Sequence, residues 1–456
     1  MFELLIKGGT LVTPTAQFQA DVGVTGGKIV AVGTDLGAEA GQVVDAAGKL
    51  VLPGALDVHT HLAMPFGGTV SSDDYETGTR AAACGGVTTV FDYAKQTKGR
   101  GMVECLEERR RMAEDVACVD YAFHCIITNL NGGTILDEYP AAIEYGVTSV
   151  KCFMVYKKEG MMVNDGEIVQ LLQRGKETGM LTNVHAENPD VIDLNIDKFL
   201  AEGKTSPWYH YLSRPEWVEA EADKRLIHWA RSLNAPVYIV HLADWEGVAE
   251  VIRAKDEGVP VYAETCPQYL HFTSEVYKRP DGRNFVCSPP MKGQRSQDAL
   301  WEALRNGFIN TVATDHCPFQ QAEKDWGKDD FTKIPNGCGG VEQIYPFMLS
   351  SALEGRVSLE KVVEVCCANP AHIFGCASKG SLDVGKDADV VLFDPAGHFT
   401  VTQSATHGAC DHTIWEGTPL KGKLLQTYSR GRLVYDGGRF VGAPGWGTFL
   451  RRKCHG

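Results

Sequence analysis

Short apolar runs alternate with longer amphipathic stretches through the middle of this 456-residue chain. The apolar runs predict strands at 55–61, 88–93, 120–127, 147–153, 181–185, 237–241, 260–264 and 310–315. The stretches between them predict helices, for example at 103–115, 165–178, 224–233 and 245–257. Eight strands that alternate with helices favour an α/β fold built on a parallel (β/α)8 TIM barrel, which takes about 250 residues.

Both ends of the chain have a different sequence pattern. Residues 2–50 and 380–440 contain short strand-like runs, and the Gly-Gly pairs at 8–9 and 26–27 are typical of hairpins. We therefore predict one smaller β-sandwich formed by both chain ends. The expected limits are 1–52 and 379–440 for the sandwich, 53–378 for the barrel, and 441–456 for a C-terminal tail.

Composition excludes several classes of protein. The formal net charge is −14 and the basic residues are scattered, which argues against a nucleic-acid partner. No apolar segment reaches about 18 residues, so no membrane span is expected, and the N-terminus lacks the features of a signal peptide. The 14 cysteines form no CxxC pairs and indicate reduced core residues of a cytoplasmic protein.

Five of the predicted strands end in residues that suit a metal. The first ends in His59-Thr-His61, whose two imidazoles share one face of a strand. Others carry Lys151, His185, His241 and Asp315 at or near their ends. Because the carboxyl ends of barrel strands build the active site, these side chains should converge. Six ligands exceed the needs of one tetrahedral zinc, so we predict two metals about 3.5–4 Å apart.

Lys151 is the unusual member of this set. An ammonium has no lone pair, and a neutral amine can bind one metal but not bridge two. Carboxylation of its amine by carbon dioxide would make an anionic carbamate with two oxygens that could bridge the pair. The alternative is that Lys151 is a structural ion-pair partner of Asp315.

Three polar residues near these ligands have structural explanations. His316 follows Asp315 but should point the other way, and His124 on the third strand has no counterpart among the ligands, so both favour packing. Asp57 lies two residues before His59. It either supports a ligand through a hydrogen bond or binds backbone groups at the strand end.

Several motifs resemble the cyclic amidohydrolases, most closely the hydantoinase and dihydropyrimidinase branch, and the likeness covers nearly the whole chain. The matching stretches are 54–61 (GALDVHTH), 64–69 (MPFGGT), 151–156 (KCFMVY), 185–188 (HAEN), 264–270 (ETCPQYL), 288–290 (SPP), 315–319 (DHCPF) and 334–337 (IPNG).

The resemblance implies a site with two divalent ions, usually zinc. His59, His61 and Asp315 would hold one ion. His185 and His241 would hold the other, with carboxylated Lys151 between them. The resemblance also implies that the Tyr156 hydroxyl stabilises an oxyanion, and that backbone groups at Ser288 and Asn336 hold the ring amide. It implies a homotetramer, with a homodimer as the alternative, and a role for the C-terminal tail in oligomer contacts.

The function expected from this resemblance is metal-dependent hydrolysis of a cyclic amide bond. The small-molecule substrates would be 5-substituted hydantoins of D-type, 5,6-dihydropyrimidines, or both, and the products N-carbamoyl amino acids. Asp315 would move a proton from the attacking water to the leaving ring nitrogen. Met64, Phe66, Phe153 and Met161 are apolar residues that follow or end catalytic strands, so they either line the pocket for the ring substituent or pack against neighbouring loops.

Three other functions compete with this expectation. An allantoinase or a dihydroorotase-like enzyme would use the same ligands. A dihydroorotase must also hold a substrate carboxylate, yet the segment 61–66 (HLAMPF) carries no cationic lysine or arginine and favours an apolar or small substituent. A non-catalytic scaffold of the same fold would have lost metal ligands, whereas all six are present.

Overall fold

Eight parallel strands form a barrel in the computed structural model, which describes residues 1–37, 39–97 and 99–454. The strands are β6 (Ala55–Thr60), β9 (Val87–Lys95), β10 (Asp120–Ile126), β11 (Ser149–Phe153), β12 (Leu181–His185), β13 (Val237–Ile239), β14 (Val261–Thr265) and β15 (Thr311–Val312). Each pairs with the next in this order. A parallel bridge between Thr60 and His316 joins the first strand to the segment after the last, so the barrel nearly closes.

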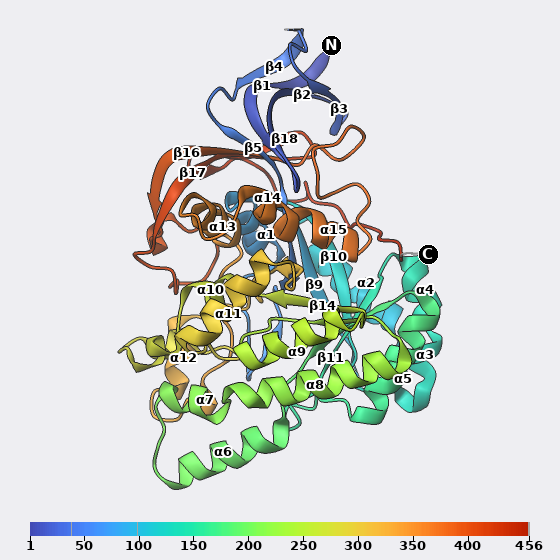
Figure 1. Cartoon of the computed structure of the whole chain (residues 1–456), viewed down its shortest axis with the longest axis vertical. Helices are drawn as coiled ribbons and strands as arrows, with labels where there is room; N and C mark the ends of the chain where they lie inside the picture. The colour runs from blue at the N-terminus through green and yellow to red at the C-terminus, as the bar shows by residue number, and fades with distance from the viewer. Residues whose placement is uncertain (38, 98, 455–456) are drawn as a thin grey trace.

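Helices cover the outside of the barrel (Figure 1). Those that follow successive strands include α1 (Tyr75–Cys84), α2 (Met102–Ala113), α4 (Tyr139–Tyr145), α5 (Asp165–Thr178), α8 (Glu216–Leu233), α9 (Trp245–Asp256), α11 (Gln294–Arg305) and α13 (Ile344–Leu353). Helix α5 shows why such a helix begins where it does. The Asn164 side chain accepts from the Glu167 amide, and the Glu167 side chain accepts in return from the Asn164 amide.

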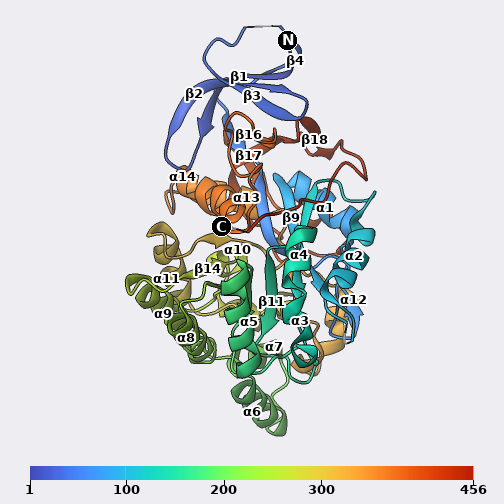
Figure 2. The ribbon, with the colours of Figure 1, turned by 90° about the vertical axis from the view of Figure 1, so that its right-hand side faces the viewer.

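Both ends of the chain form a second, mostly antiparallel sheet at one end of the molecule (Figures 1 and 2). Its strands are β1 (Phe2–Val12), β2 (Gln17–Thr25), β3 (Lys28–Gly33), β4 (Ala40–Asp45), β5 (Leu50–Pro53), β16 (Val390–Thr400), β17 (Pro419–Ser429), β18 (Arg432–Asp436) and β19 (Arg439–Phe440). Strand β5 pairs with both β1 and β16, so it joins the N-terminal strands to the C-terminal ones.

These two units confirm the predicted fold class, and each predicted barrel strand is present. The elements differ from the predictions mainly at their ends. Strand β9 continues to Lys95, because its pairing with β10 extends to Lys95 opposite Ile126. Helix α8 begins at Glu216 rather than at 224. The domain limits 1–52, 53–378 and 379–440 stay predictions.

Three groups of buried side chains hold these layers together. The largest lies mainly between the barrel strands and their helices. A second fills the barrel with residues such as Val58, Phe91 and Tyr238. A third combines residues from both chain ends, including Ile6, Val22 and Val390. This shared core explains why neither terminal segment forms its sheet alone.

The C-terminal segment packs against the amino-terminal ends of the barrel strands β10 and β11. The amide of Leu450 donates to the Tyr121 carbonyl at 2.8 Å. Arg452 is buried, and its guanidinium donates to the Ser149 hydroxyl and to the Phe123 carbonyl. Residues 455 and 456 of the predicted tail lie outside the described residues, and its role in oligomer contacts stays a prediction.

Two further predictions concern the environment of the protein. Among the described helices, none is long and apolar enough to cross a membrane. All 14 cysteines are free, and all but Cys410 and Cys454 are buried.

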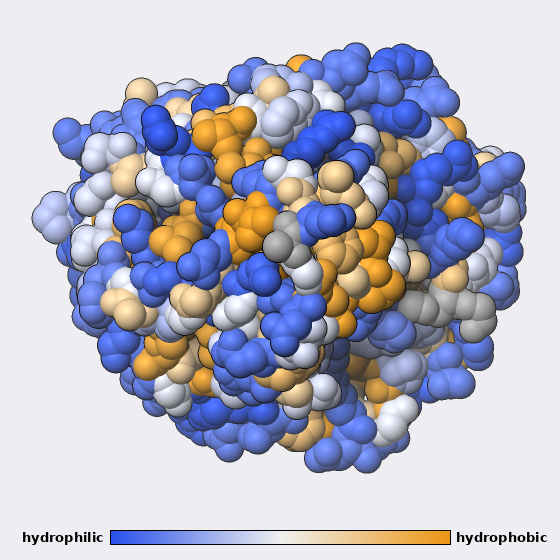
Figure 3. Space-filling model, turned by 90° about the horizontal axis from the view of Figure 1, so that it is seen from above, coloured by the Kyte–Doolittle hydropathy of each residue, from blue (hydrophilic) through white to orange (hydrophobic). Residues whose placement is uncertain are grey.

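Seen from the end that carries the antiparallel sheet, the surface shows hydrophobic side chains in patches among polar ones (Figure 3).

Candidate metal centre and active site

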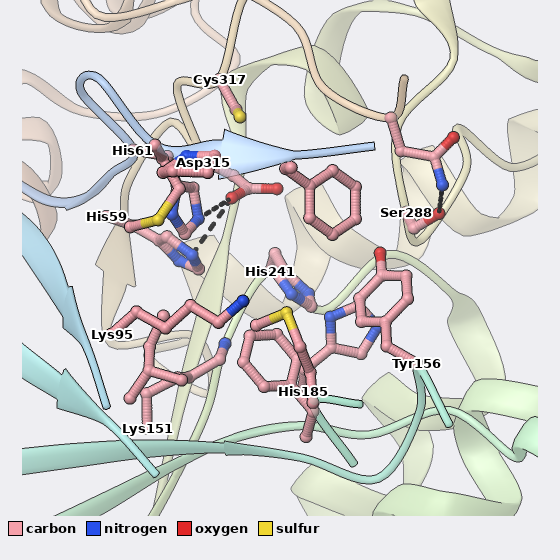
Figure 4. Close-up of a pocket in the computed structure, with 17 residues that line it drawn as sticks. His59, His61, Lys95, Lys151, Tyr156, His185, His241, Ser288, Asp315 and Cys317 are labelled. Atoms are coloured by element: carbon pink, nitrogen blue, oxygen red, sulfur yellow. Dashed lines mark hydrogen bonds and ion pairs between the residues drawn. The ribbon is translucent and has the colours of Figure 1, made fainter. Parts of the chain in front are cut away.

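The six predicted ligands line one pocket at the carboxyl end of the barrel (Figure 4). His59 lies in β6 and His61 follows that strand, whereas Lys151 and His185 lie in β11 and β12. His241 follows β13 by two residues, and Asp315 follows β15 by three. The parallel barrel therefore brings together residues that lie up to 256 positions apart in the chain.

His59, His61 and Asp315 form one compact group. The Asp315 Oδ1 atom lies 3.1 Å from His59 Nε2 and 2.9 Å from His61 Nε2. One ligand atom from each residue lies within 4.8 Å of the others, which suits a single metal ion. Burial raises the pKa of Asp315, but the two imidazoles outweigh it and hold that pKa well below its usual range. Asp315 is therefore an ionised carboxylate.

Glu264 orients His59 through Nδ1, the ring nitrogen that does not face Asp315. Its Oε1 atom lies 2.7 Å from His59 Nδ1 and accepts from the His241 amide at 3.0 Å. Burial lowers the pKa of His59, but the Glu264 and Asp315 carboxylates raise it to about 9 overall. A carboxylate behind a metal-binding imidazole fixes the ring and its tautomer. The sequence contained a signal for Glu264, since it closes the predicted seventh strand, but no role was assigned to it.

His185 and His241 form the second group, with ring centroids 4.4 Å apart. His185 Nε2 lies 2.7 Å from Glu187, which also binds the Arg214 guanidinium at 2.7 Å. This leaves His185 Nδ1 as the nitrogen available to a ligand. The buried Nδ1 atom of His241 has no partner in the described part of the chain. Burial lowers the pKa of both histidines, so both favour the neutral form that binds metals.

Lys151 lies beside these histidines with its amine buried. Its Nζ atom has no hydrogen-bond partner among the described residues, and no ion pair joins it to Asp315. An unpartnered buried ammonium is costly. Burial accordingly lowers the pKa of Lys151 to about 8. The neutral amine, which is the form that reacts with carbon dioxide, is thus accessible near neutral pH.

These observations test whether the residues fit metal ions. Two imidazoles and a carboxylate meet at one point, and a second pair of imidazoles lies beside a buried amine that lacks a partner. Nitrogen and carboxylate ligands of this kind suit borderline divalent metals. The donor set therefore fits.

Tyr156 and two neighbours lie on the other side of the same pocket (Figure 4). The Tyr156 ring lies 5.4 Å from that of His185, measured between centroids. The Asn336 side-chain amide donates to the Ser288 hydroxyl at 3.1 Å. Tyr156, His241 and Asp315 all have positive φ values, of 66°, 41° and 52°. Side chains other than glycine rarely adopt this region, and such strain gathers at functional sites.

Apolar side chains form much of the remaining wall. Met64, Phe66, Phe153 and Met161 all line the pocket, as does Ile126. The empty space, counted out to its open mouth, is about 570 Å³.

Lys95 also lines this pocket, and the sequence did not indicate it as a site residue. The predicted second strand ends at 93, two residues before Lys95, so the sequence gives no signal that Lys95 lies at a strand end. The segment after His61 holds no cation, as the sequence indicated, but β9 brings one into the pocket from elsewhere in the chain.

The other polar residues have structural partners. His316 Nε2 lies 2.9 Å from Asp73, and the two ring nitrogens of His124 contact Ser149 and the Val58 carbonyl. Asp57 accepts from the backbone amides of His59 and Thr314. Of the two explanations for Asp57, the structure shows the backbone one.

Comparisons with known proteins extend these observations. Residues 50–434 match the amidohydrolase family. The chain is 42% identical to a D-hydantoinase of Ralstonia pickettii, with 99% of each chain covered. It is 41% identical to a D-phenylhydantoinase of Escherichia coli, covering 99% of this chain and 98% of the relative. The crystal structure of a dihydropyrimidinase from Brevibacillus agri superposes with a TM-score of 0.97 at 40% identity over 99% of each chain.

Proposed function

Because this chain belongs to the amidohydrolase family, in its hydantoinase and dihydropyrimidinase branch, we propose that it hydrolyses the cyclic amide bond of hydantoins or 5,6-dihydropyrimidines. The substrates would be 5-substituted hydantoins of D-type, dihydropyrimidines, or both, and the products N-carbamoyl amino acids. The observation that carries this proposal is the convergence of all six metal-type residues, with Tyr156, on one pocket.

We propose that two divalent ions, zinc by preference, bind here. His59, His61 and Asp315 would hold one, and His185 and His241 the other. Lys151, carboxylated by carbon dioxide, would bridge them, since its amine lies in the pocket without a partner. When bound, such ions lower the pKa of water and polarise carbonyl groups.

The residues of the chain would then divide the remaining work. The ionised Asp315 carboxylate accepts the proton of the attacking water and passes it to the leaving ring nitrogen. The Tyr156 hydroxyl donates to the carbonyl oxygen as negative charge develops on it. Burial raises the pKa of Tyr156, so the hydroxyl keeps its proton for this role.

Substrate positioning would come from the pocket walls. Backbone groups at Ser288 and Asn336 would hold the ring amide, and the bond between their side chains keeps these two loops together. Met64, Phe66 and Phe153 would contact the ring substituent. Closely packed apolar walls also exclude water, which strengthens the electrostatic interactions in the site.

The test is a rate comparison with purified, metal-loaded protein. Its substrates are dihydrouracil, hydantoin, 5-phenylhydantoin, allantoin and dihydroorotate, side by side. We expect the first three to be hydrolysed fastest, and D-phenylhydantoin faster than its enantiomer. A higher rate on allantoin or dihydroorotate would instead assign one of the alternative activities. Metal-free, folded and inactive protein would favour the scaffold.

We further propose a cytoplasmic homotetramer, with a homodimer as the alternative. The fourteen unpaired cysteines suit a reducing compartment. Exposed hydrophobic side chains at Leu194, Leu200 and Trp217 offer surface for subunit contacts. Light scattering after size-exclusion chromatography gives the mass, and cell fractionation gives the compartment. A monomer or an exported protein would contradict these assignments.

A further inference from the structure

Lys95 is a cation at the end of β9 with access to the catalytic pocket. Its amino group points into the pocket near that of Lys151 (Figure 4). Apart from the six proposed ligands, Lys95 is the only charged side chain among the described residues that line this pocket. The other lining residues are apolar or neutral polar groups.

No hydrogen bond or ion pair joins the Lys95 side chain to another described residue. Other cations of the chain differ in this respect. Arg214 binds Glu187 at 2.7 Å, and Lys158 binds Asp193 at 2.9 Å. The backbone of Lys95 is held by its pairing with Ile126, so the strand fixes the position while the ammonium stays free. A fixed cation without a partner, facing a ligand pocket, is suited to an anion on the ligand.

We propose that Lys95 selects, among 5-substituted hydantoins, those whose exocyclic substituent carries a carboxylate. This inference rests on the proposed function and names the substrate class of the same site. A lysine ammonium offers three donors and no acceptor, and hydrogen bonds between charged groups are roughly twice as strong as neutral ones.

A competing role for Lys95 is to bind the carboxylated form of Lys151. Two observations favour the substrate. Lys95 is solvent-exposed, whereas Lys151 is 1% exposed. Divalent ions beside Lys151 would also repel a second cation and direct the Lys95 ammonium toward the open part of the pocket. The two roles differ in what they predict for neutral substrates, which gives the test.

The experiment compares 5-(carboxymethyl)hydantoin with its neutral isostere 5-(carbamoylmethyl)hydantoin, using the metal-loaded enzyme. We expect Lys95→Met to lower kcat/KM for the carboxylate about 10-fold or more and to change kcat/KM for the amide by less than about 2-fold. Lys95→Arg should keep the preference for the carboxylate. Lys95→Glu should reduce this preference further than Lys95→Met does. The matched control is Lys158→Met, which removes a cation outside the pocket and should leave the ratio unchanged.

Calorimetric binding of N-carbamoylaspartate and N-carbamoylasparagine gives a readout that does not depend on turnover. The inference requires tighter binding of the aspartate product, and loss of that difference in Lys95→Met. Equal binding in the wild type overturns it. Equal losses of kcat/KM on both hydantoins, together with a lower metal content, also overturn the inference. That result would indicate that Lys95 binds the carboxylated form of Lys151. Absence of turnover on the hydantoins and on dihydrouracil contradicts the proposed function, whatever the binding difference.

Discussion

At the scale of single residues, we propose two tasks for Asp315, metal binding and proton transfer, because it contacts two histidines and faces the pocket. Asp315→Asn keeps the size of the side chain but removes its capacity to accept a proton. We expect the fold to persist and kcat to fall about 10²–10⁴-fold. Steady-state kinetics, with metal content measured on the same sample, is the check. Turnover near that of the wild type at full metal occupancy would remove Asp315 from proton transfer.

Tyr156 provides a narrower test at this scale. Tyr156→Phe removes only the hydroxyl, and the ring can keep its contacts with Phe66 and His185. Because an oxyanion donor acts mainly in the transition state, kcat should fall on the order of 10²–10³-fold while KM changes little. An unchanged kcat would show that this hydroxyl takes no part in the reaction.

In the proposed two-metal site, Lys151 is the residue on which binding of both ions depends. Lys151→Ala should lose the metal pair and the activity while the barrel still folds, because the bridging anion is absent. Added propionate could occupy the vacated space and restore part of both. Metal analysis and an electron-density map of the wild type are the measurements. A fully active Lys151→Ala enzyme, or two ions bridged by another group, would contradict the prediction.

At the scale of elements, the loops after β6 and β11 carry the apolar wall of the pocket. Phe66 lies in one of them, and Phe153 ends β11. Their rings lie 5.4 Å and 5.7 Å from that of Tyr156. Truncation to leucine should change the ratio of rates on 5-phenylhydantoin and dihydrouracil several-fold, since a loss of contact area weakens the larger substituent more. Proportional losses on both substrates would indicate a packing role instead.

The positions of Glu264 and Lys95 are also explained by the strands that carry them. Strands β14 and β9 end beside the site, so the last residues of each face the pocket or its ligands. Glu264 contacts His59 across the barrel, although 205 residues separate the two in the chain. These contacts come from the arrangement of strands around the barrel rather than from any local motif.

At the scale of the whole molecule, the C-terminal segment supports the barrel from the end opposite the active site. The Arg452 guanidinium lies 4.8 Å from the Phe91 ring and donates to Ser149, whose hydroxyl contacts His124. Arg452→Ala should destabilise the fold by about 2–4 kcal/mol, since buried polar groups lose their partner. Differential scanning calorimetry at equal metal content should show a lower Tm.

The neighbouring Arg451 provides a matched control for this prediction, because it is exposed. Arg451→Ala should change stability by no more than about 0.5 kcal/mol. If both variants keep the Tm of the wild type, the segment does not support the barrel. If Arg452→Ala instead dissociates the oligomer with no change in the Tm of the subunit, the predicted role of the tail in assembly would gain support.

The sequence alone determined the barrel and its candidate ligands. Strand and helix periodicities are local properties, and a His-x-His pair at a strand end points both rings one way whatever surrounds it. The rule that parallel strands place their carboxyl ends together then predicted that His59, Lys151, His185 and Asp315 lie in one site. The structure brings all four to the same pocket.

Only the tertiary structure showed how these groups are held and what else faces them. Where a strand ends depends on its pairing with the neighbouring strand. The extension of β9 that places Lys95 at the pocket was therefore not visible in the local sequence. The contacts of Glu264 with His59 and of Arg452 with Ser149 join elements that are far apart in the chain. Such pairings depend on strand register and barrel closure, which arise when all the elements pack together.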